Sequence, residues 1–131
     1  MPEVKNKRVL IVDDDNDILD VMKEALSYEG YEVRAITGTN DIFPDIIQRR
    51  PDLILMDYLL AGINGGELCH QIKNNSSTQA IPVIIMSAHP RVINSLGTYG
   101  CDAFIAKPFD LDDVTENIHR LITKAEKQYS C

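Results

Sequence analysis

Short, unbroken apolar runs recur along this chain of 131 residues, and they constrain its fold more than any other feature. Runs of this kind, rich in β-branched residues, are typical of strands buried on both faces of a parallel sheet. Three clear runs occupy residues 9–12, 53–56 and 83–86, and a weaker fourth occupies 103–106. Residues 31–35 alternate between apolar and polar instead, which predicts a half-exposed edge strand. The chain therefore carries five predicted strands.

Apolar residues at helical spacing fill the segments that follow these strands. They repeat every three or four positions, so we expect each set to lie along one helix face and to pack in the core. The sets are Ile18, Met22, Ala25 and Leu26; Ile42, Phe43, Ile46 and Ile47; Leu68, Cys69 and Ile72; Val92, Ile93 and Leu96; and Leu111, Val114, Ile118, Leu121, Ile122 and Ala125. Gly30 is a stop signal for the first helix, and Pro44 fits only the first turn of the second. Five strand–helix units in succession predict an α/β fold with parallel strands and right-handed crossovers.

Composition narrows the classes of function. Thirteen Lys and Arg against twenty Asp and Glu give a net charge of −7, which argues against a surface for nucleic acid or an anionic membrane. No apolar run approaches the roughly 20 residues of a membrane span, and residues 9–12 are too few for a signal peptide. The three cysteines lack the close spacing of a zinc site, so we predict free thiols in a reducing cytoplasm. No linker divides the chain, which predicts a single domain over residues 1–131.

Polar and charged residues follow the predicted strands at the point where each one ends. Residues 13–15 are three aspartates after the first strand, and Asp57, Ser87 and Lys107 follow the third, fourth and fifth. Each alone has an ordinary explanation, such as a helix N-cap, a turn hydroxyl or a surface charge. Parallel sheets bind ligands at the carboxyl ends of their strands. Because four strand ends carry such residues, we predict a functional site there.

The chemistry of that site follows from its charges. Clustered carboxylates repel one another, so they favour a bound cation, and Mg²⁺ (or Mn²⁺) prefers hard oxygen ligands of this kind. Lys107 adds a second positive charge. An acidic site filled by cations can receive a phosphoryl group, with Asp57 as a carboxylate nucleophile and the cations offsetting charge on the phosphoryl oxygens.

Five short motifs, taken in this order, match one known family. They are V-D-D at 12–14, L-M-D at 55–57, I-N-G-G at 63–66, M-S-A at 86–88 and K-P-F at 107–109. The chain resembles the receiver domain of two-component response regulators, the CheY-like family, over a core of about residues 6–125. The resemblance implies a doubly wound, flavodoxin-like (βα)5 fold, a three-layer sandwich whose parallel sheet has the strand order 2-1-3-4-5.

The resemblance also implies a role for each residue of the predicted site. Asp57 matches the aspartate that accepts the phosphoryl group. Asp14 matches a direct Mg²⁺ ligand, Asp13 a ligand acting through water, and the backbone carbonyl of Leu59 a further ligand. Lys107 matches the lysine that pairs with the phosphoryl group, and the peptide bond that follows it is expected to be cis.

Four residues are expected to act after phosphorylation. By resemblance, the hydroxyl of Ser87 turns inward to bond a phosphoryl oxygen, and the aromatic ring of Phe104 follows it. Leu59 and His89 border the path of attacking water. We expect apolar Leu59 to hinder that water, whereas His89 could screen it, position it, or be a solvent-exposed loop residue without a role.

The function implied by the resemblance is that of a signal receiver in a two-component system or phosphorelay. The phosphoryl donor is then a histidine kinase or a histidine phosphotransfer protein, and the fourth helix, fifth strand and fifth helix present the signal to a downstream protein effector. We expect a cytoplasmic monomer or weak phosphorylation-dependent dimer, with no direct contact to nucleic acid or membrane. We expect no output domain within these 131 residues, which are either a stand-alone protein or a fragment of a longer one. Catalysis is confined to its own phosphorylation and slow dephosphorylation.

Two alternatives stay open. One is a small Mg²⁺-dependent phosphohydrolase that uses Asp57 as its nucleophile, although such enzymes usually carry a second aspartate two residues later, where this chain has Leu59. The other is a receiver-like binding module that is never phosphorylated. Modules of that kind typically lack an acidic residue or the lysine, and this chain keeps all of them.

Overall fold

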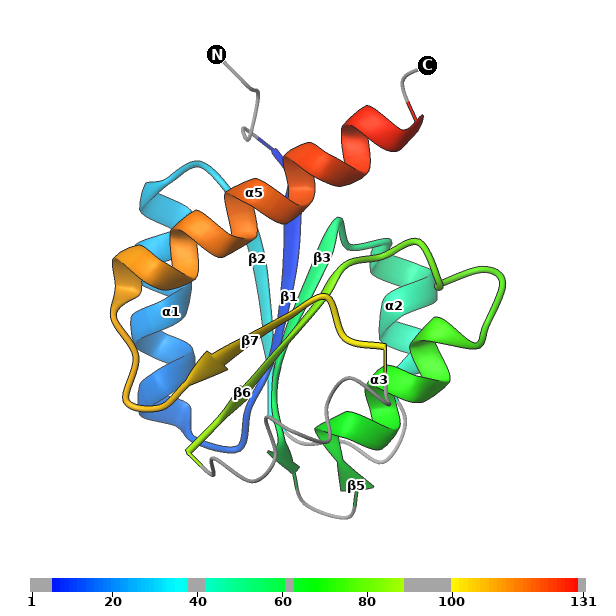
Figure 1. The fold of residues 1–131 in the computed structure, drawn as a ribbon. Coiled ribbons are helices and arrows are strands. Elements are labelled where there is room, and N and C mark those ends of the chain that lie inside the picture. Colours follow the sequence, from blue (N-terminus) through cyan, green and yellow to red (C-terminus); the bar gives the residue numbers. More distant parts are fainter. Residues whose placement is uncertain (1–5, 38–41, 61–62, 89–99, 130–131) are drawn as a thin grey trace.

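The chain forms a five-stranded parallel sheet between layers of helices, in a computed structural model that describes residues 6–37, 42–60, 63–88 and 100–129 (Figure 1). The strand order is β2-β1-β3-β6-β7, so β6 and β7 are the fourth and fifth strands of the sheet. Every pair of neighbouring strands is parallel. The predicted α/β fold and the order 2-1-3-4-5 are therefore confirmed.

The strands of the sheet lie where the apolar runs predict them. They are β1 (Arg8–Val12), β2 (Glu32–Ile36), β3 (Leu53–Asp57), β6 (Val83–Ser87) and β7 (Ala103–Ala106). All residues of β3 and β6 are buried, because helices cover both faces of the sheet there. The strand β2 lies at one edge and is partly exposed, as its alternating pattern predicts.

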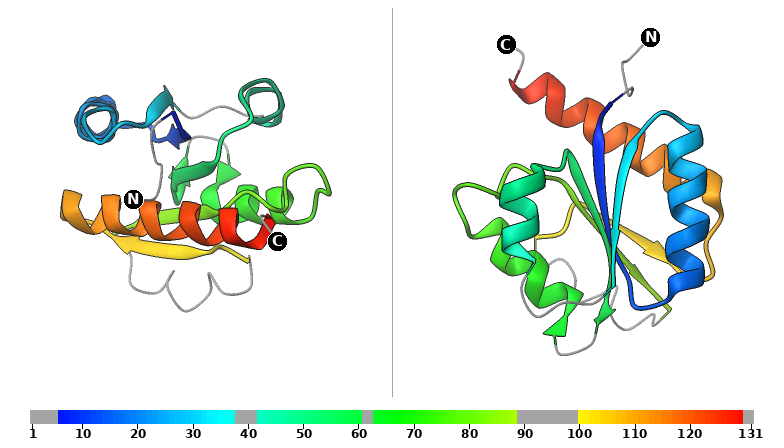
Figure 2. Two further views of the ribbon diagram at one scale, coloured as in Figure 1. Left: turned by 90° about the horizontal axis from the view of Figure 1, so that it is seen from above. Right: turned by 180° about the vertical axis from the view of Figure 1, so that it is seen from behind.

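The helices divide between the two faces of the sheet. They are α1 (Asn16–Tyr28), α2 (Phe43–Arg49), α3 (Gly65–Lys73) and α5 (Leu111–Tyr129). One buried cluster joins α1 and α5 to alternate residues of the strands, and a second joins α2 and α3 to the remaining ones. Figure 2 shows α1 on one side of the sheet and α2 with α3 on the other. This is the predicted three-layer sandwich.

Local sequence explains where these helices begin and end. Pro44 lies in the first turn of α2, where its missing N–H costs no hydrogen bond. Gly30 has a φ of 99° just after α1, and its N–H donates to the carbonyl of Ser27. The predicted packing of Ile47 in the core is wrong, because the short helix α2 leaves this side chain 61% exposed while Ile46 is buried.

One element of the structure was not predicted from the sequence, and one predicted helix lies outside the described part of the chain. After β3, the strands β4 (Leu59–Leu60) and β5 (Ile63–Asn64) form a small antiparallel pair, where the sequence suggested only a loop. Strands of two residues have too few positions to show an apolar period. The helix expected around residues 92–96 lies outside the described residues.

Candidate functional site

The carboxyl ends of the central strands bring the predicted site residues to one edge of the sheet. Asp13 directly follows β1, and Asp57 and Ser87 are the last residues of β3 and β6. Lys107 directly follows β7, and its N–H donates to the carbonyl of Ser87 at 2.9 Å. Parallel pairing in register therefore places residues from four separate segments side by side.

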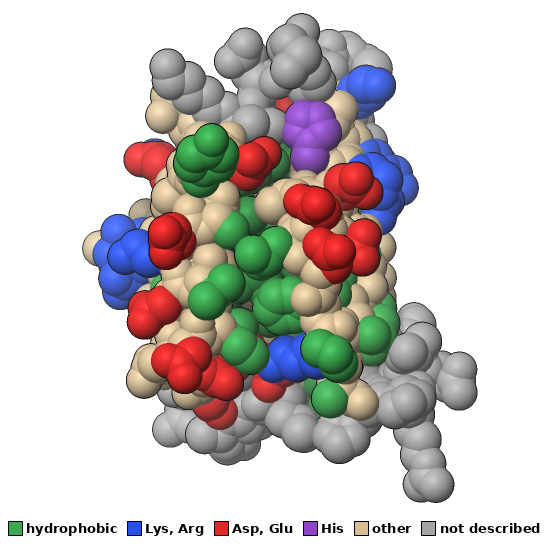
Figure 3. All heavy atoms as spheres, turned by 90° about the vertical axis from the view of Figure 1, so that its left-hand side faces the viewer, with side chains coloured by type: hydrophobic (Ala, Val, Ile, Leu, Met, Phe, Trp, Pro, Cys, Tyr) green, Lys and Arg blue, Asp and Glu red, His purple; other side chains and the backbone are tan. Residues whose placement is uncertain are grey.

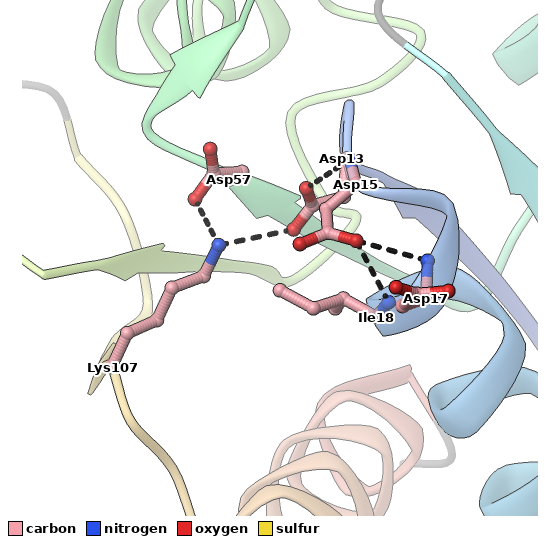
Figure 4. Close-up of polar contacts among 6 residues, drawn as sticks. All are labelled: Asp13, Asp15, Asp17, Ile18, Asp57 and Lys107. Carbon is pink, nitrogen blue, oxygen red and sulfur yellow. Dashed lines mark hydrogen bonds and ion pairs between the residues drawn. The ribbon is translucent and has the colours of Figure 1, made fainter.

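The ammonium group of Lys107 lies between two carboxylates, as Figure 4 shows. Its Nζ is 2.7 Å from Asp57 Oδ1 and 3.2 Å from Asp13 Oδ2. The side chains are only 19%, 13% and 2% exposed for Lys107, Asp57 and Asp13. At this burial, ion pairs are screened far less by water than they are on the surface. The three side chains form one charged cluster at the carboxyl ends of the strands.

The two carboxylates keep Lys107 protonated. Burial by itself lowers the pKa of the ammonium group, since it disfavours the charged form. The hydrogen bond and negative charge of Asp57, followed by those of Asp13, outweigh the burial and raise the pKa of Lys107 above its usual range. Lys107 is therefore a fixed positive charge at neutral pH.

Asp15 has the structural role that an aspartate before a helix usually has. Its Oδ1 accepts hydrogen bonds from the N–H groups of Asp17 and Ile18, at 2.9 and 3.3 Å, and so caps α1 (Figure 4). Its own N–H donates to Oδ1 of Asp13 at 2.9 Å. The cap therefore also orients Asp13, whose other oxygen faces Lys107.

The remaining predicted residues differ in how much the structure describes. Asp14 lies next to Asp13 in the chain and is exposed, and the hydroxyl-bearing side chain of Ser87 is buried. Phe104 is partly buried against the cluster of α2 and α3. Leu59 pairs through its backbone with Asn64 in the β4–β5 hairpin. His89 lies outside the described residues.

Gly65 supports the site and was not recognised as doing so from the sequence. A Cβ at this position would lie 2.5 Å from the backbone oxygen of Asp57, closer than real Cβ contacts. The Gly65 N–H also donates to the carbonyl of Tyr58 at 2.6 Å. The sequence signal for this role was the Gly-Gly pair at the start of α3. Gly65 is needed there because a side chain would collide with the backbone of Asp57.

The donor set at this edge fits a divalent cation. Asp13 and Asp57 supply two carboxylates against one ammonium group, so negative charge is in excess, and the exposed Asp14 follows Asp13 directly in the chain. Mg²⁺ is usually bound by one or two carboxylates and retains several waters, so it needs no dense cage of side chains. Within the described ranges, no three His, Cys, Asp or Glu side chains form a ready metal cluster, and Lys107 bridges two of the carboxylates instead.

The peptide bond between Lys107 and Pro108 is cis, as the resemblance implied. The class of α/β domains with a charged site at the carboxyl ends of their strands is defined here by an aspartate after the first strand, one at the end of the third and a lysine after the fifth. The family model for the response regulator receiver domain matches residues 9–119. The chain belongs to the response regulator receiver domain family.

Individual relatives agree with this assignment. The chain is 38% identical over 122 residues to the nisin biosynthesis regulatory protein NisR of Lactococcus lactis, covering 92% of this chain and 52% of NisR. It is 32% identical over 120 residues to the phosphate regulon transcriptional regulatory protein PhoB of Pseudomonas aeruginosa, covering 90% of this chain and 52% of PhoB. The chain thus spans about half the length of these curated relatives.

A solved structure supports the same family. The CheY-like receiver domain protein of Methanospirillum hungatei superposes with a TM-score of 0.86 at 32% identity, covering 95% of this chain and 99% of that one. Among the described helices, none combines the length and the apolar character needed to cross a bilayer. The longest, α5, is amphipathic and packs on the sheet through residues such as Val114 and Ile118.

Proposed function

We propose that the chain is a phosphorylation-switched signal receiver whose acceptor is Asp57. The observation that carries this proposal is the position of Lys107, whose Nζ bridges Asp57 Oδ1 and Asp13 Oδ2 in a buried setting. A receiver domain of response regulators is a signalling domain, and response regulators partner with histidine kinases and downstream effectors. Here the immediate donor is a histidine kinase or a histidine phosphotransfer protein.

The transfer step uses the carboxylate of Asp57 as nucleophile. One of its oxygens attacks the phosphorus of a phospho-histidine, and the new O–P bond forms as the P–N bond breaks. The electron pair of the broken bond passes to the ring nitrogen of the donor, which then takes up a proton. Lys107, already protonated, offsets negative charge on the phosphoryl oxygens.

Receiver domains generally bind Mg²⁺, and the carboxylates here fit that ion. Asp13, Asp14, Asp57 and the backbone carbonyl of Leu59 would hold Mg²⁺ or Mn²⁺. When bound, the ion neutralises charge on the phosphoryl oxygens during transfer. The chain's own residues keep the carboxylates in place: Asp15 orients Asp13, and Gly65 lets α3 approach the backbone of Asp57.

Ser87 and Phe104 are proposed as the switch. Ser87 is buried at the end of β6, where it pairs in register with Ala106 of β7, and Phe104 lies earlier on β7 opposite Ile85. The added phosphoryl charge draws the Ser87 hydroxyl inward, and a change at this hydroxyl is passed to the neighbouring strand. Output then passes through the fourth helix, β7 and α5. The fourth helix lies outside the described residues.

The test of the switch uses beryllofluoride with Mg²⁺ as a phosphoryl mimic. We expect amide resonances around Ser87 and Phe104 to shift in the wild-type chain and to stay unchanged in Asp57→Asn. Unchanged spectra in both proteins would instead favour a binding module that is never phosphorylated. Release of many equivalents of phenol from an aryl phosphate would favour the phosphohydrolase alternative.

A groove between α1 and α5 is proposed as the docking surface for the donor. Figure 3 shows hydrophobic side chains in a strip with acidic side chains along both sides. The groove has a volume of about 430 Å³ and includes Val21, Tyr28 and Leu111, with Glu24 and Asp112 among its acids. Tyr28 is 89% exposed, which is unusual for a large aromatic side chain. This charge pattern suits a helix with an apolar face and basic edges.

Docking and chemistry are separable in this proposal. We expect Tyr28→Ser to slow transfer from a phosphorylated histidine phosphotransfer protein and to leave phosphorylation by acetyl phosphate unchanged. Equal rates from the protein donor in both chains would remove the groove from the account.

In the same proposal, residues 1–131, with a core over about 6–125, form one receiver domain that works in the cytoplasm as a monomer or weak dimer.

The lifetime of the acyl phosphate is proposed to depend on Leu59 and His89, which border the path of attacking water by resemblance to the family. Replacing His89 with Ala and timing the loss of the phosphoryl group tests this part. A changed half-life supports a role for His89, and an unchanged one removes it.

A further inference from the structure

A second concave site lies at the opposite end of the sheet from Asp57. It is a cavity of about 460 Å³ between the amino ends of β1 and β2 and the carboxyl end of α2. This end of β1 is at the top of Figure 1, near the label N. The volume falls in the range of small-molecule sites, which is about 300–1,000 Å³. None of the residues of the proposed phosphorylation site lines this cavity.

The lining of this cavity is basic on a chain that is acidic overall. Arg8, Arg34 and Arg49 line it, whereas Glu32 is its single carboxylate. Outside the lining, Asp45 lies 4.0 Å from Arg34, and Asp52 accepts the backbone N–H of Arg8. The cavity lining itself carries more positive than negative charge, on a chain with a net charge of −7. A local field of this sign attracts anions, even though the molecule as a whole repels them.

The guanidinium group of Arg8 makes two contacts within the protein. Its Nη1 donates to the carbonyl of Arg49 at 2.9 Å, and its Nε lies 3.5 Å from Oε2 of Glu32. The backbone N–H of Arg8 donates to Asp52 Oδ2 at 2.8 Å. Arg8 therefore links the end of α2 to the start of β1, and its side chain is 55% exposed, which leaves its guanidinium accessible to a ligand.

The other two arginines are less committed. Arg34 lies 4.0 Å from Asp45 Oδ1, at the limit of an ion pair, and its side chain is 48% exposed. Arg49 uses its backbone carbonyl for Arg8, and among the described residues its guanidinium has no carboxylate partner. Exposed ion pairs contribute little free energy, so a ligand can replace the long contact of Arg34 at small cost.

We propose that this cavity binds a small molecule that carries a diphosphate group. The planar guanidinium fork matches phosphate oxygens in a two-point contact, and every cation lining the cavity is an arginine. Three guanidinium groups lining one cavity suit a ligand with two adjacent phosphate groups. The site is independent of the phosphorylation chemistry, because it shares no residue with it.

The test uses inorganic pyrophosphate as the probe and the 131-residue chain carrying Asp57→Asn, in buffer without Mg²⁺. These conditions remove the phosphoryl acceptor and the metal ion at the other end of the sheet, and shifts near Lys107 are read separately from those at the cavity. We expect saturable shifts of the backbone amides of Arg8, Val33 and Arg49. The double variant Arg34→Gln/Arg49→Gln should weaken binding by about tenfold or more, because two charge-assisted hydrogen-bond donors are lost.

Arg120→Gln on α5 is the charge-matched control, since Arg120 does not line the cavity, and it should leave the affinity for pyrophosphate unchanged. The single variant Arg49→Gln gives the same test with a smaller change, should the double variant unfold. The proposal is overturned when pyrophosphate causes no saturable shift, when the shifts lie elsewhere, or when the cavity variants bind as well as the control.

Discussion

Two lysine–aspartate pairs in this molecule have the same shortest distance but differ in burial and in surroundings, since the Asp102 side chain is 34% exposed and that of Asp57 is 13% exposed. Lys73 Nζ lies 2.7 Å from Asp102 Oδ2, and Lys107 Nζ lies 2.7 Å from Asp57 Oδ1. Lys73 also donates to the carbonyls of Ile81 and Gln79, at 2.7 and 3.4 Å. Lys107 meets a second carboxylate instead, Asp13, at 3.2 Å.

The difference lies in how charge is balanced. In the first pair one ammonium meets one carboxylate, and Asp102 also accepts the backbone N–H of Val83 at 2.8 Å. Charge there is neutral, and backbone groups complete the hydrogen bonding, so the pair fastens α3 to the strands. At Lys107 two buried carboxylates share one cation, which leaves negative charge in excess. A balanced ion pair needs no further ligand, whereas a pair with excess negative charge can take a further cation.

Removing each lysine should give the largest difference between the two pairs. Lys107→Met leaves two buried carboxylates without a cation, and we expect a loss of about 3 kcal/mol in the free energy of unfolding. Added Mg²⁺ should restore part of this loss, because it supplies the missing charge. Lys73→Met should also lose stability, and Mg²⁺ should restore nothing beyond its effect on the wild-type chain. Urea unfolding with and without Mg²⁺ measures both; equal Mg²⁺ responses would contradict the comparison.

Neutralising one carboxylate in each pair should have opposite consequences. Asp102→Asn removes the carboxylate that pairs with Lys73 among the described residues, so we expect a loss of about 1–2 kcal/mol in the free energy of unfolding. Asp57→Asn removes one of two repelling carboxylates and leaves Asp13 to pair with Lys107, so stability should stay the same or rise. Unfolding in Mg²⁺-free buffer measures the two variants. A loss in Asp57→Asn as large as in Asp102→Asn would show that negative charge is not in excess at the site.

The sequence predicted one of these pairs far better than the other. Asp13, Asp57 and Lys107 stand at the ends of apolar strands, so the topology of a parallel sheet alone brings them together. Lys73 ends a helix and Asp102 precedes a strand, and neither belongs to a motif. Their contact depends on how α3 is placed against the sheet, which no periodicity in the sequence specifies.

The same distinction applies to the fold. Strands with unbroken runs, such as Leu53–Met56, were predicted to within one residue, because burial on both faces requires an apolar side chain at every position. The short β4–β5 hairpin and the exposure of Ile47 were missed, since both depend on local geometry. Gly65 was visible as a motif residue, yet only the structure shows that its missing Cβ makes room for the backbone of Asp57.

Exposed aspartates should affect Mg²⁺ binding only where they lie at the site of excess negative charge. We expect Asp14→Ala to weaken Mg²⁺ binding by about tenfold, since one carboxylate ligand is lost. Asp17→Ala is the control: Asp17 is also exposed, but lies within the first turn of α1 beyond the Asp15 cap. Calorimetric titration with Mg²⁺ measures both affinities. An equal weakening in the two variants would mean that only the general negative potential matters.

The smallest expected effect is on the pH dependence of stability. The pKa of Lys107 is raised above its usual 10.5 by Asp57 and Asp13, in spite of burial. This ion pair therefore contributes stability that is fully present below pH 10.5 and is lost as the pH rises through the higher folded pKa. Burial also raises the pKa of Tyr31 and of Cys69 to about 12, which acts in the same direction.

Tyr31 and Cys69 are present in both the wild-type chain and Lys107→Met, so the difference in pH dependence between these two proteins reports on Lys107. Above pH 10.5 the free energy of unfolding should fall more steeply in the wild-type chain than in the variant, by less than about 1.4 kcal/mol per pH unit. Unfolding curves at several alkaline pH values measure the slopes. Parallel slopes would mean that the two carboxylates do not hold the proton on Lys107.

The most direct test of the central claim is the intact mass of the chain before and after acetyl phosphate with Mg²⁺, measured beside Asp57→Asn and Asp102→Asn. The account predicts that the wild-type chain and Asp102→Asn each gain one phosphoryl group, and that Asp57→Asn gains none. A phosphoryl group on Asp57→Asn, or none on the wild-type chain, would contradict it.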